Sequence, residues 1–195
     1  MAHLVLFDLD GTLTRNDTFM AMIRHSHGHG QWLLGLAVCS PWIVAFKMGI
    51  IPNWRAKEVV LRYFYGGWQE QDFINKARAF ASDMDDLLRE EAKETLSAYA
   101  SEGHTQVIVT ASCEAWVKPW AERKGFHTIG SRLEVKEGKI TGKLVPANCY
   151  GPEKARRVSE AFDLNAFDKI IAYGDSRGDR EMLALADEPH YRPWQ

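Results

Sequence analysis

Short apolar segments that end in acids or hydroxyl residues constrain this chain more than any other feature. Three of them, at 3–7 (HLVLF), 106–110 (QVIVT) and 169–174 (KIIAYG), have the length and composition of strands buried on both faces of a parallel sheet. Helical patterns lie between them, for example at 84–103, where Leu and Ala recur at helical spacing. The alternation predicts an α/β fold with a doubly wound parallel sheet, whose functional loops gather at the carboxyl ends of the strands.

Two regions depart from this alternation. Residues 132–144 alternate apolar and polar side chains on either side of KEGK, which predicts a β-hairpin, and another strand is expected near 127–131. Residues 15–82 show only helical patterns and hold four of the seven tryptophans. We therefore expect a catalytic core of residues 1–14 and 83–195, and a helical cap of residues 15–82 over the loop end of the sheet.

Composition argues against several classes of function. The 195 residues include 24 basic and 26 acidic side chains without a basic block, so nucleic acid is not an expected partner. Cys39, Cys113 and Cys149 form no CxxC pair, which argues against a disulfide framework and a structural zinc site. The first residues show no signal-peptide pattern. These features predict a cytoplasmic protein.

An apolar stretch inside the expected cap leaves two alternatives open. Residues 32–51 are long enough to cross a bilayer, but Ser40, Pro41 and Lys47 interrupt them. The other alternative is a pair of helices that is buried or touches a membrane surface and is broken at Pro41. Membrane association therefore remains an open alternative for this part of the chain.

Acids follow both the first and the last predicted strand. Asp8 comes directly after the first strand with Asp10 on the same turn, whereas Asp175 follows the last strand with Asp179 four residues later. Because parallel strands end at one edge of a sheet, we expect these acids to meet there. An Asp-rich turn is the alternative for the first pair alone. Like charges brought together need a cation, and an oxygen-only site suits Mg²⁺.

Two further loops supply groups that suit phosphate. The segment VIVTAS ends with Thr110 and Ser112 at the start of a helix, where hydroxyl and main-chain N–H groups favour an anion. Lys154 stands at the start of another helix and would neutralise charge. Together with the acids, these groups form the set that phosphoryl transfer requires. We assign nucleophilic attack to Asp8 and proton transfer to Asp10, because both the leaving group and the later water exchange a proton.

These segments resemble, in order, the four motifs of the haloacid dehalogenase superfamily: DLDGT, VIVTAS, Lys154 and GDSRGD. Within it the chain is similar to subfamily IB, typified by phosphoserine phosphatase. The resemblance implies a Rossmann-like core, a small helical cap inserted after the first motif, and an aspartyl-phosphate on Asp8. It implies Mg²⁺ bound by Asp8, the main-chain carbonyl of Asp10 and Asp175, with Asp179 supporting the metal site. It also implies a phosphate site formed by Thr110, Ala111 and Lys154.

The resemblance leaves the substrate open. In phosphoserine phosphatases an acid after the first motif and a cap arginine receive the amino acid; here Asp17 takes the place of the acid, and Arg62 and Ser112 are candidate specificity residues. Gly178 replaces the Asn that is typical of the fourth motif, so serine phosphate is not carried over. The apolar cap resembles the phosphatidylglycerophosphatase C branch.

These observations lead us to expect a Mg²⁺-dependent phosphatase that hydrolyses a small phosphorylated metabolite. The alternatives are a lipid-phosphate phosphatase at the membrane surface, a phosphotransferase, and a protein that binds lipid surfaces through its cap.

Overall fold

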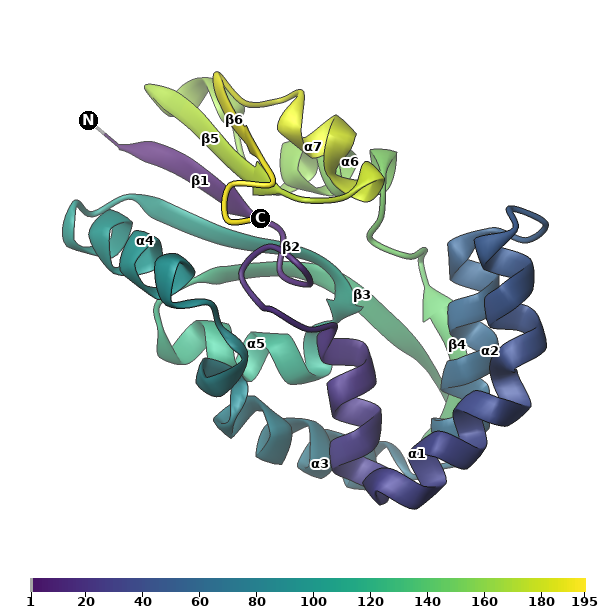
Figure 1. Cartoon of the computed structure of the whole chain (residues 1–195). Helices are drawn as coiled ribbons and strands as arrows, with labels where there is room; N and C mark the ends of the chain where they lie inside the picture. The colour runs from purple at the N-terminus through teal and green to yellow at the C-terminus, as the bar shows by residue number, and fades with distance from the viewer. Residues whose placement is uncertain (1) are drawn as a thin grey trace.

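A six-stranded sheet forms the centre of the molecule in the computed structural model, which describes residues 2–195 (Figure 1). The strand order is β4-β3-β2-β1-β5-β6, and all neighbours run parallel except β3 and β4. The predicted α/β fold with a parallel sheet is therefore confirmed. The strands are β1 (His3–Phe7), β2 (Thr105–Cys113), β3 (His127–Lys136), β4 (Lys139–Val145), β5 (Lys169–Gly174) and β6 (Glu188–Tyr191).

Helices cover both faces of the sheet (Figure 1). Helices α4 (Glu90–Ser101) and α5 (Glu114–Arg123) lie on one face, and α6 (Pro152–Ala161) and α7 (Arg180–Leu183) lie on the other. Successive side chains of β1 point to opposite faces of the sheet. Phe7 packs into the apolar cluster on the first face and Leu6 into the cluster on the second. Short 3₁₀ helices lie at η1 (Met84–Leu87), η2 (Leu164–Ala166) and η3 (Arg177–Asp179).

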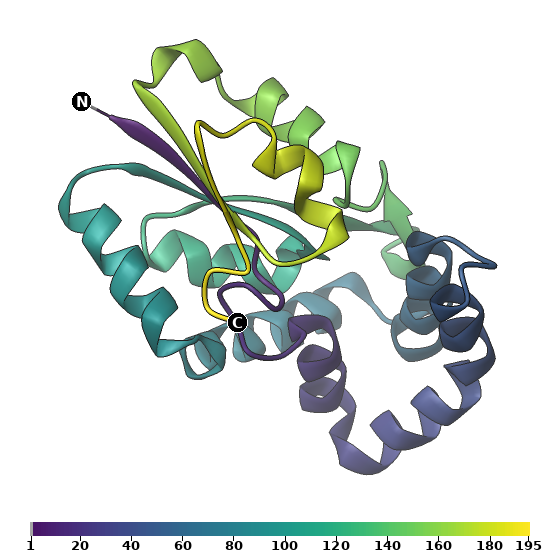
Figure 2. The ribbon, with the colours of Figure 1, turned by 45° about the horizontal axis from the view of Figure 1, so that its top comes forward.

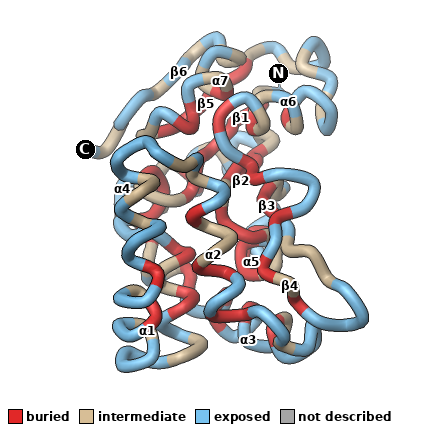
Figure 3. The backbone as a smooth tube through the Cα atoms, turned by 90° about the vertical axis from the view of Figure 1, so that its right-hand side faces the viewer, coloured by how far each residue is buried: buried red, intermediate tan, exposed pale blue. Residues whose placement is uncertain are grey.

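Three long helices occupy the chain between β1 and η1. They are α1 (Thr18–Lys47), α2 (Asn53–Tyr65) and α3 (Glu70–Ser82). The end of α1 and the whole of α2 stand beside the carboxyl end of the sheet, and α3 returns towards α5 (Figure 2). Buried residues concentrate in the strands, whereas much of α1 is exposed (Figure 3). Among residues 2–195, no helix has both the length and the apolar character needed to cross a membrane.

The irregularity in α1 is not at Pro41, so the prediction of a helix break there was wrong. Pro41 lies inside the helix. Its ring lacks the N–H that would bond to the carbonyl of Ala37, and the hydroxyl of Ser40 donates to that carbonyl instead, at 2.7 Å. The helical path is interrupted at Gly28, with φ 78° and ψ 167°, a conformation that glycine adopts readily.

The predicted hairpin is present and joins the helical region to the sheet. Glu137 and Gly138 both have positive φ, as a two-residue type I′ turn requires. Strand β3 pairs with β2 along its first half and with β4 along its second. The connection between α2 and α3 bonds to β4 through main-chain groups: the N–H of Gly67 donates to Ile140 and the N–H of Ile140 to Trp68, both at 2.9 Å.

Candidate active site

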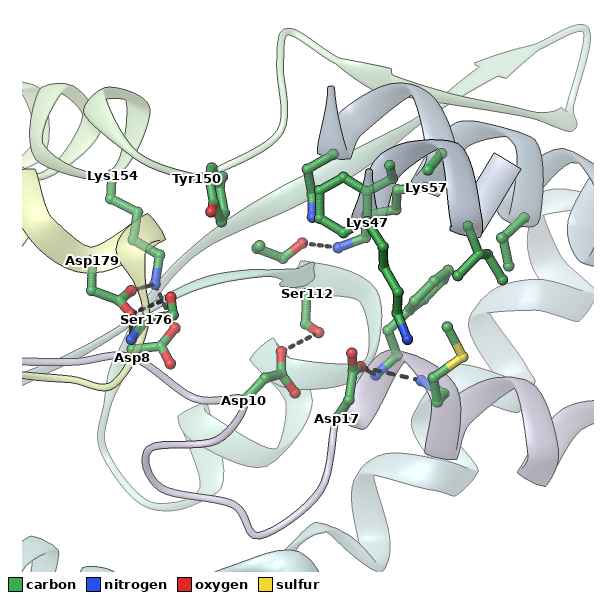
Figure 4. A pocket seen from close by; sticks show the side chains of 18 residues that line it. Asp8, Asp10, Asp17, Lys47, Lys57, Ser112, Tyr150, Lys154, Ser176 and Asp179 are labelled. Atoms are coloured by element: carbon green, nitrogen blue, oxygen red, sulfur yellow. Dashed lines mark hydrogen bonds and ion pairs between the residues drawn. The ribbon is translucent and has the colours of Figure 1, made fainter. Parts of the chain in front are cut away.

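Three of the four predicted acids, Asp8, Asp175 and Asp179, meet at the carboxyl edge of the sheet, and Figure 4 shows Asp8 and Asp179 on either side of Lys154. Carboxylate oxygens of Asp8, Asp175 and Asp179 lie within 4.8 Å of one another. The hydroxyl of Thr12 lies 3.1 Å from Asp8 Oδ2 and 3.3 Å from Asp175 Oδ1, so it connects the loop after β1 with the loop after β5. Their common position follows from the topology, because β1 and β5 are parallel neighbours and end together.

Lys154 is buried between two of these acids. Its ammonium group forms an ion pair with Asp8, donates to Asp179 Oδ1 at 2.6 Å and donates to the main-chain oxygen of Val109 at 2.7 Å. Only 1% of the residue is exposed. Burial opposes the charge, but the two carboxylates outweigh burial and hold the pKa of Lys154 above its ordinary value. The lysine is therefore charged and links α6 to both acid-bearing loops.

One ammonium group cannot neutralise two buried carboxylates. Burial raises the pKa of Asp8 to about 7, because the neighbouring charges of Asp179 and Asp10 add to desolvation and Lys154 offsets these effects only in part. Asp179 behaves differently: burial is outweighed by Lys154 and Ser176, so its pKa is lowered. In the metal-free cluster a proton is therefore taken up more readily by Asp8 than by Asp179.

The hydrogen bonds distinguish two kinds of acid in this cluster. Both oxygens of Asp179 are occupied, one by Lys154 and the other by the N–H and hydroxyl of Ser176, at 2.9 and 2.7 Å. The Asp175 carboxylate accepts fewer hydrogen bonds: among the described side chains, only the Thr12 hydroxyl and the Gln195 amide donate to it. Asp8 and Asp175 therefore keep free lone pairs, and this all-oxygen donor set fits Mg²⁺, which prefers one or two carboxylates together with water and phosphate.

Asp10 points away from this cluster, towards the start of α1. Its Oδ1 accepts from the main-chain N–H of Thr18 and its Oδ2 from the hydroxyl of Ser112, both at 2.6 Å. Thr110 is fully buried; its hydroxyl accepts from the N–H of Ser112 at 2.9 Å and lies 3.4 Å from Asp10 Oδ2. Thr110 does not line the cavity described below, whereas Ala111 and Ser112 do.

A cavity of about 360 Å³ lies above these loops. Its core side carries polar groups, including Asp8, Asp10, Lys154 and Ser112. Its other side is formed by the helical region and is largely apolar, with Phe19, Met20, Ile43, Phe46, Ala56 and Val60. The cavity can therefore hold a molecule with a charged end and an apolar body.

Of the two specificity candidates in the helical region, only Asp17 reaches the cavity. Asp17 caps α1 by accepting from the N–H of Phe19 at 2.8 Å, and it also lines the cavity. Burial and the nearby Asp10 raise its pKa. Arg62 is exposed on the side of α2 that rests on β4, next to Gly142, and it does not line the cavity.

Lys57 is the cationic residue of α2 that does line the cavity, and sequence reasoning missed it. Its ammonium group donates to the main-chain oxygen of Ala111 at 2.5 Å. Burial lowers the pKa of Lys57, although Asp10 and Asp17 act against that change. The signal was present in the helical spacing, because Lys57 precedes the buried Leu61 by one turn and so lies on the inner side of the helix.

Comparison with known proteins supports the motif assignment. The sequence profile of the haloacid dehalogenase-like hydrolases matches residues 5–184. Protein CicA of Caulobacter vibrioides (strain NA1000 / CB15N) is 38% identical over 192 residues, which cover 97% of this chain and 85% of that protein.

Two other proteins resemble this chain less closely in sequence. A phosphoserine phosphatase of Archaeoglobus fulgidus is 28% identical over 102 residues, which cover 51% of this chain and 30% of that protein. A protein of unknown function from Bordetella pertussis Tohama I shares the fold, with a TM-score of 0.80, 21% identity and coverage of 95% and 87% of the two chains. The extent of the profile match and the identity to the Caulobacter protein show that the chain belongs to the haloacid dehalogenase-like hydrolase family.

Proposed function

We propose that the protein is a Mg²⁺-dependent phosphatase that hydrolyses a phosphate monoester through a phospho-aspartyl intermediate on Asp8. The observation that carries the proposal is the environment of Asp8, one of whose oxygens is paired with Lys154 while the other faces Thr12 and Asp175 at the base of the cavity. A carboxylate held in this way is oriented for attack, and its neighbours are cationic or cation-binding groups.

In the proposed mechanism, Asp8 attacks the phosphorus atom and the bond from phosphorus to the ester oxygen breaks. Asp10 gives its proton to the leaving oxygen. It later takes a proton from the water that attacks the phospho-aspartate, which releases inorganic phosphate and restores Asp8. Ser112 and the start of α1 hold the Asp10 carboxylate during both transfers.

The remaining groups stabilise charge. Lys154 and the main-chain N–H of Ala111 are proposed to bind the phosphoryl oxygens, while Thr110 orients this turn by accepting a hydrogen bond from the Ser112 N–H. Mg²⁺, bound by Asp8, the main-chain carbonyl of Asp10 and Asp175, would offset negative charge on the phosphoryl group. Asp179 is proposed to hold Lys154 and the loop that carries Asp175 in place.

Phosphate release tests this proposal. Purified protein should hydrolyse p-nitrophenyl phosphate with Mg²⁺ and lose that activity with EDTA. Asp8→Asn should abolish turnover, whereas Asp168→Asn, an exposed acid that precedes β5 at the opposite edge of the sheet, should not. Equal activity in Asp8→Asn and the unmodified protein would refute the role of Asp8. Transfer of phosphate to an added alcohol in preference to water would indicate a phosphotransferase.

A second candidate function is hydrolysis of a lipid phosphate at a membrane surface, and the exposed apolar surface of the cap favours it. The helix α1 that lines the cavity with Ile43 and Phe46 also presents apolar side chains to solvent, and the guanidinium of Arg55 in α2 lies 5.7 Å from the centroid of the exposed Trp54 ring. Exposed apolar side chains on neighbouring helices are typical of a surface that contacts a membrane or another protein. The exposed side chains are Leu33, Leu34, Val38, Trp42, Val44, Met48, Ile50, Trp54 and Tyr63.

Vesicle flotation distinguishes the two candidates. With vesicles of phosphatidylcholine and phosphatidylglycerol, the lipid-phosphate alternative predicts flotation that Met48→Ser combined with Ile50→Ser weakens. Val145→Ser, an exposed apolar residue of β4, is the matched control. Protein that stays entirely in the aqueous fraction, together with faster turnover of phosphoserine than of short-chain phosphatidylglycerophosphate, would exclude the lipid alternative.

A further inference from the structure

The segment that follows β6 lies against the loops of the first and last motifs (Figures 1 and 2). The guanidinium of Arg192 donates through Nε to the main-chain oxygen of Asp175 at 3.1 Å. The ring of Trp194 stacks on Tyr173 of β5, with centroids 5.5 Å apart and an interplanar angle of 9°. These contacts hold the segment over the acid-bearing edge of the sheet.

Gln195 extends this contact to the Asp175 side chain. Its amide nitrogen donates to Asp175 Oδ2 at 3.2 Å and to the main-chain oxygen of Gly11 at 3.0 Å. The two N–H bonds of one amide therefore join the loop after β1 to the acid after β5. Thr12 approaches the other oxygen of Asp175 at 3.3 Å, so the carboxylate is held from both sides.

A cation at the N-cap of α4 supports the same arrangement. The guanidinium of Arg89 donates to the main-chain oxygens of Gly11 and Trp194, at 3.3 and 3.4 Å. The Gly11 carbonyl thus receives both Gln195 and Arg89. The bonds of Gln195 and Arg89 involve none of the donors through which Lys154 holds Asp8 and Asp179.

We infer that Gln195 is a positioning residue for the cation site, because its amide fixes the rotation of the Asp175 carboxylate. This inference rests on the proposed function, in which Asp175 binds Mg²⁺, and it assigns a role in that binding to a residue outside the four motifs. Metal-binding carboxylates are commonly oriented by such outer partners, whose loss lowers metal affinity by about 10- to 100-fold.

Calorimetric titration of the unmodified chain and its variants with MgCl₂ tests the inference without reference to turnover. Gln195→Met keeps the length of the side chain and removes its donors, so the dissociation constant for Mg²⁺ should rise about tenfold. The Mg²⁺ concentration that gives half-maximal turnover should rise by a similar factor, because the variant weakens the hold of the site on Mg²⁺. Gln71→Met is the matched control, since Gln71 is exposed and its amide donates to Asn75, away from the cavity.

The outcomes separate this inference from the proposed function. Unchanged Mg²⁺ affinity in Gln195→Met would overturn the positioning role and leave the phosphatase proposal intact. Absence of Mg²⁺ binding by the unmodified protein would overturn both. Because Gln195 is exposed, the metal-free melting temperature should move by less than about 2 °C. The inference would be overturned if Gln195→Met lowered the melting temperature by more than this and Gln71→Met lost Mg²⁺ affinity to the same extent. That result would attribute the loss of affinity to general destabilisation.

Discussion

Lys57 connects helix α2 to the end of β2 through the main-chain oxygen of Ala111, with 2.5 Å between Lys57 Nζ and that oxygen. Lys57→Met should lower kcat/KM about tenfold, corresponding to about 1.4 kcal/mol, because the cavity loses a cation and a charged hydrogen bond. Steady-state kinetics with p-nitrophenyl phosphate measure the change. Arg62→Met is the control on the same helix, since Arg62 lies outside the cavity. Equal losses in both variants would contradict a specific role for Lys57.

Removal of Lys154 should destabilise the metal-free protein. Lys154→Met leaves Asp8 and Asp179 facing each other without the ammonium group, and breaking a buried ion pair costs about 3–5 kcal/mol. Urea unfolding with EDTA at neutral pH measures the free energy of unfolding. Lys169→Met, which removes a much more exposed ion pair with Glu188, should have a far smaller effect. A free energy of unfolding unchanged by Lys154→Met would show that the buried pair adds nothing to stability.

Mg²⁺ binding should weaken in acid. The pKa of Asp8 in the metal-free fold is about 7, so below that pH Mg²⁺ must displace a proton. The dissociation constant should rise about tenfold per pH unit below 7 and level off above it. Calorimetry between about pH 5.5 and pH 8.5 measures this dependence. A constant affinity across that range would contradict the raised pKa.

The raised pKa of Asp8 also determines how the stability of the metal-free protein changes with pH. Because the folded-state value exceeds the ordinary value of 3.8, the folded protein binds more protons than the unfolded chain between these values. The contribution of Asp8 to stability is therefore present in acid and is lost as the pH rises through about 7. Added Mg²⁺ should restore stability above that pH. Urea unfolding of Asp8→Asn beside the unmodified protein isolates this contribution, and identical pH dependence in the two would argue against it.

Gly11 should tolerate no side chain. A Cβ atom at this position would lie 2.6 Å from Asp175 Oδ2, and the backbone has φ 90°. Gly11→Ala should therefore displace Asp175 and lower Mg²⁺ affinity and turnover. Gly103→Ala is a useful comparison, because Gly103 also has a positive φ, 74°, but a Cβ there meets nothing within 4 Å. The steric explanation would be contradicted if Gly103→Ala lowered Mg²⁺ affinity and Gly11→Ala did not.

Much of the fold and the meeting of the acids could be predicted from the sequence. Strands β1 and β5 have the predicted bounds, because their buried apolar runs are bounded by residues that end strands. Parallel pairing then brings Asp8 and Asp175 to the same edge. Strand β6 was not predicted, since EPHY contains a proline and has no apolar pattern, and it forms as an edge strand by pairing with β5.

Residues whose roles depend on packing were harder to predict. Arg62 was the expected cap cation, but Lys57 faces the cavity because α2 turns its Arg62 side towards β4. Pro41 was expected to break a helix, but the helix continues through it, and the Ser40 hydroxyl donates to the Ala37 carbonyl that proline leaves without an N–H partner. The contact of Gln195 with Asp175 spans 20 residues and depends on how the chain returns after β6, which no local pattern reports.

The hairpin of β3 and β4 has a mechanical consequence. The connection between α2 and α3 forms main-chain bonds to β4, while β3 continues into the central sheet. Helices α1–α3 are therefore joined to the sheet by these main-chain bonds as well as by the covalent connections at their two ends. Any movement of α1–α3 away from the sheet would have to break these bonds or bend β3 and β4.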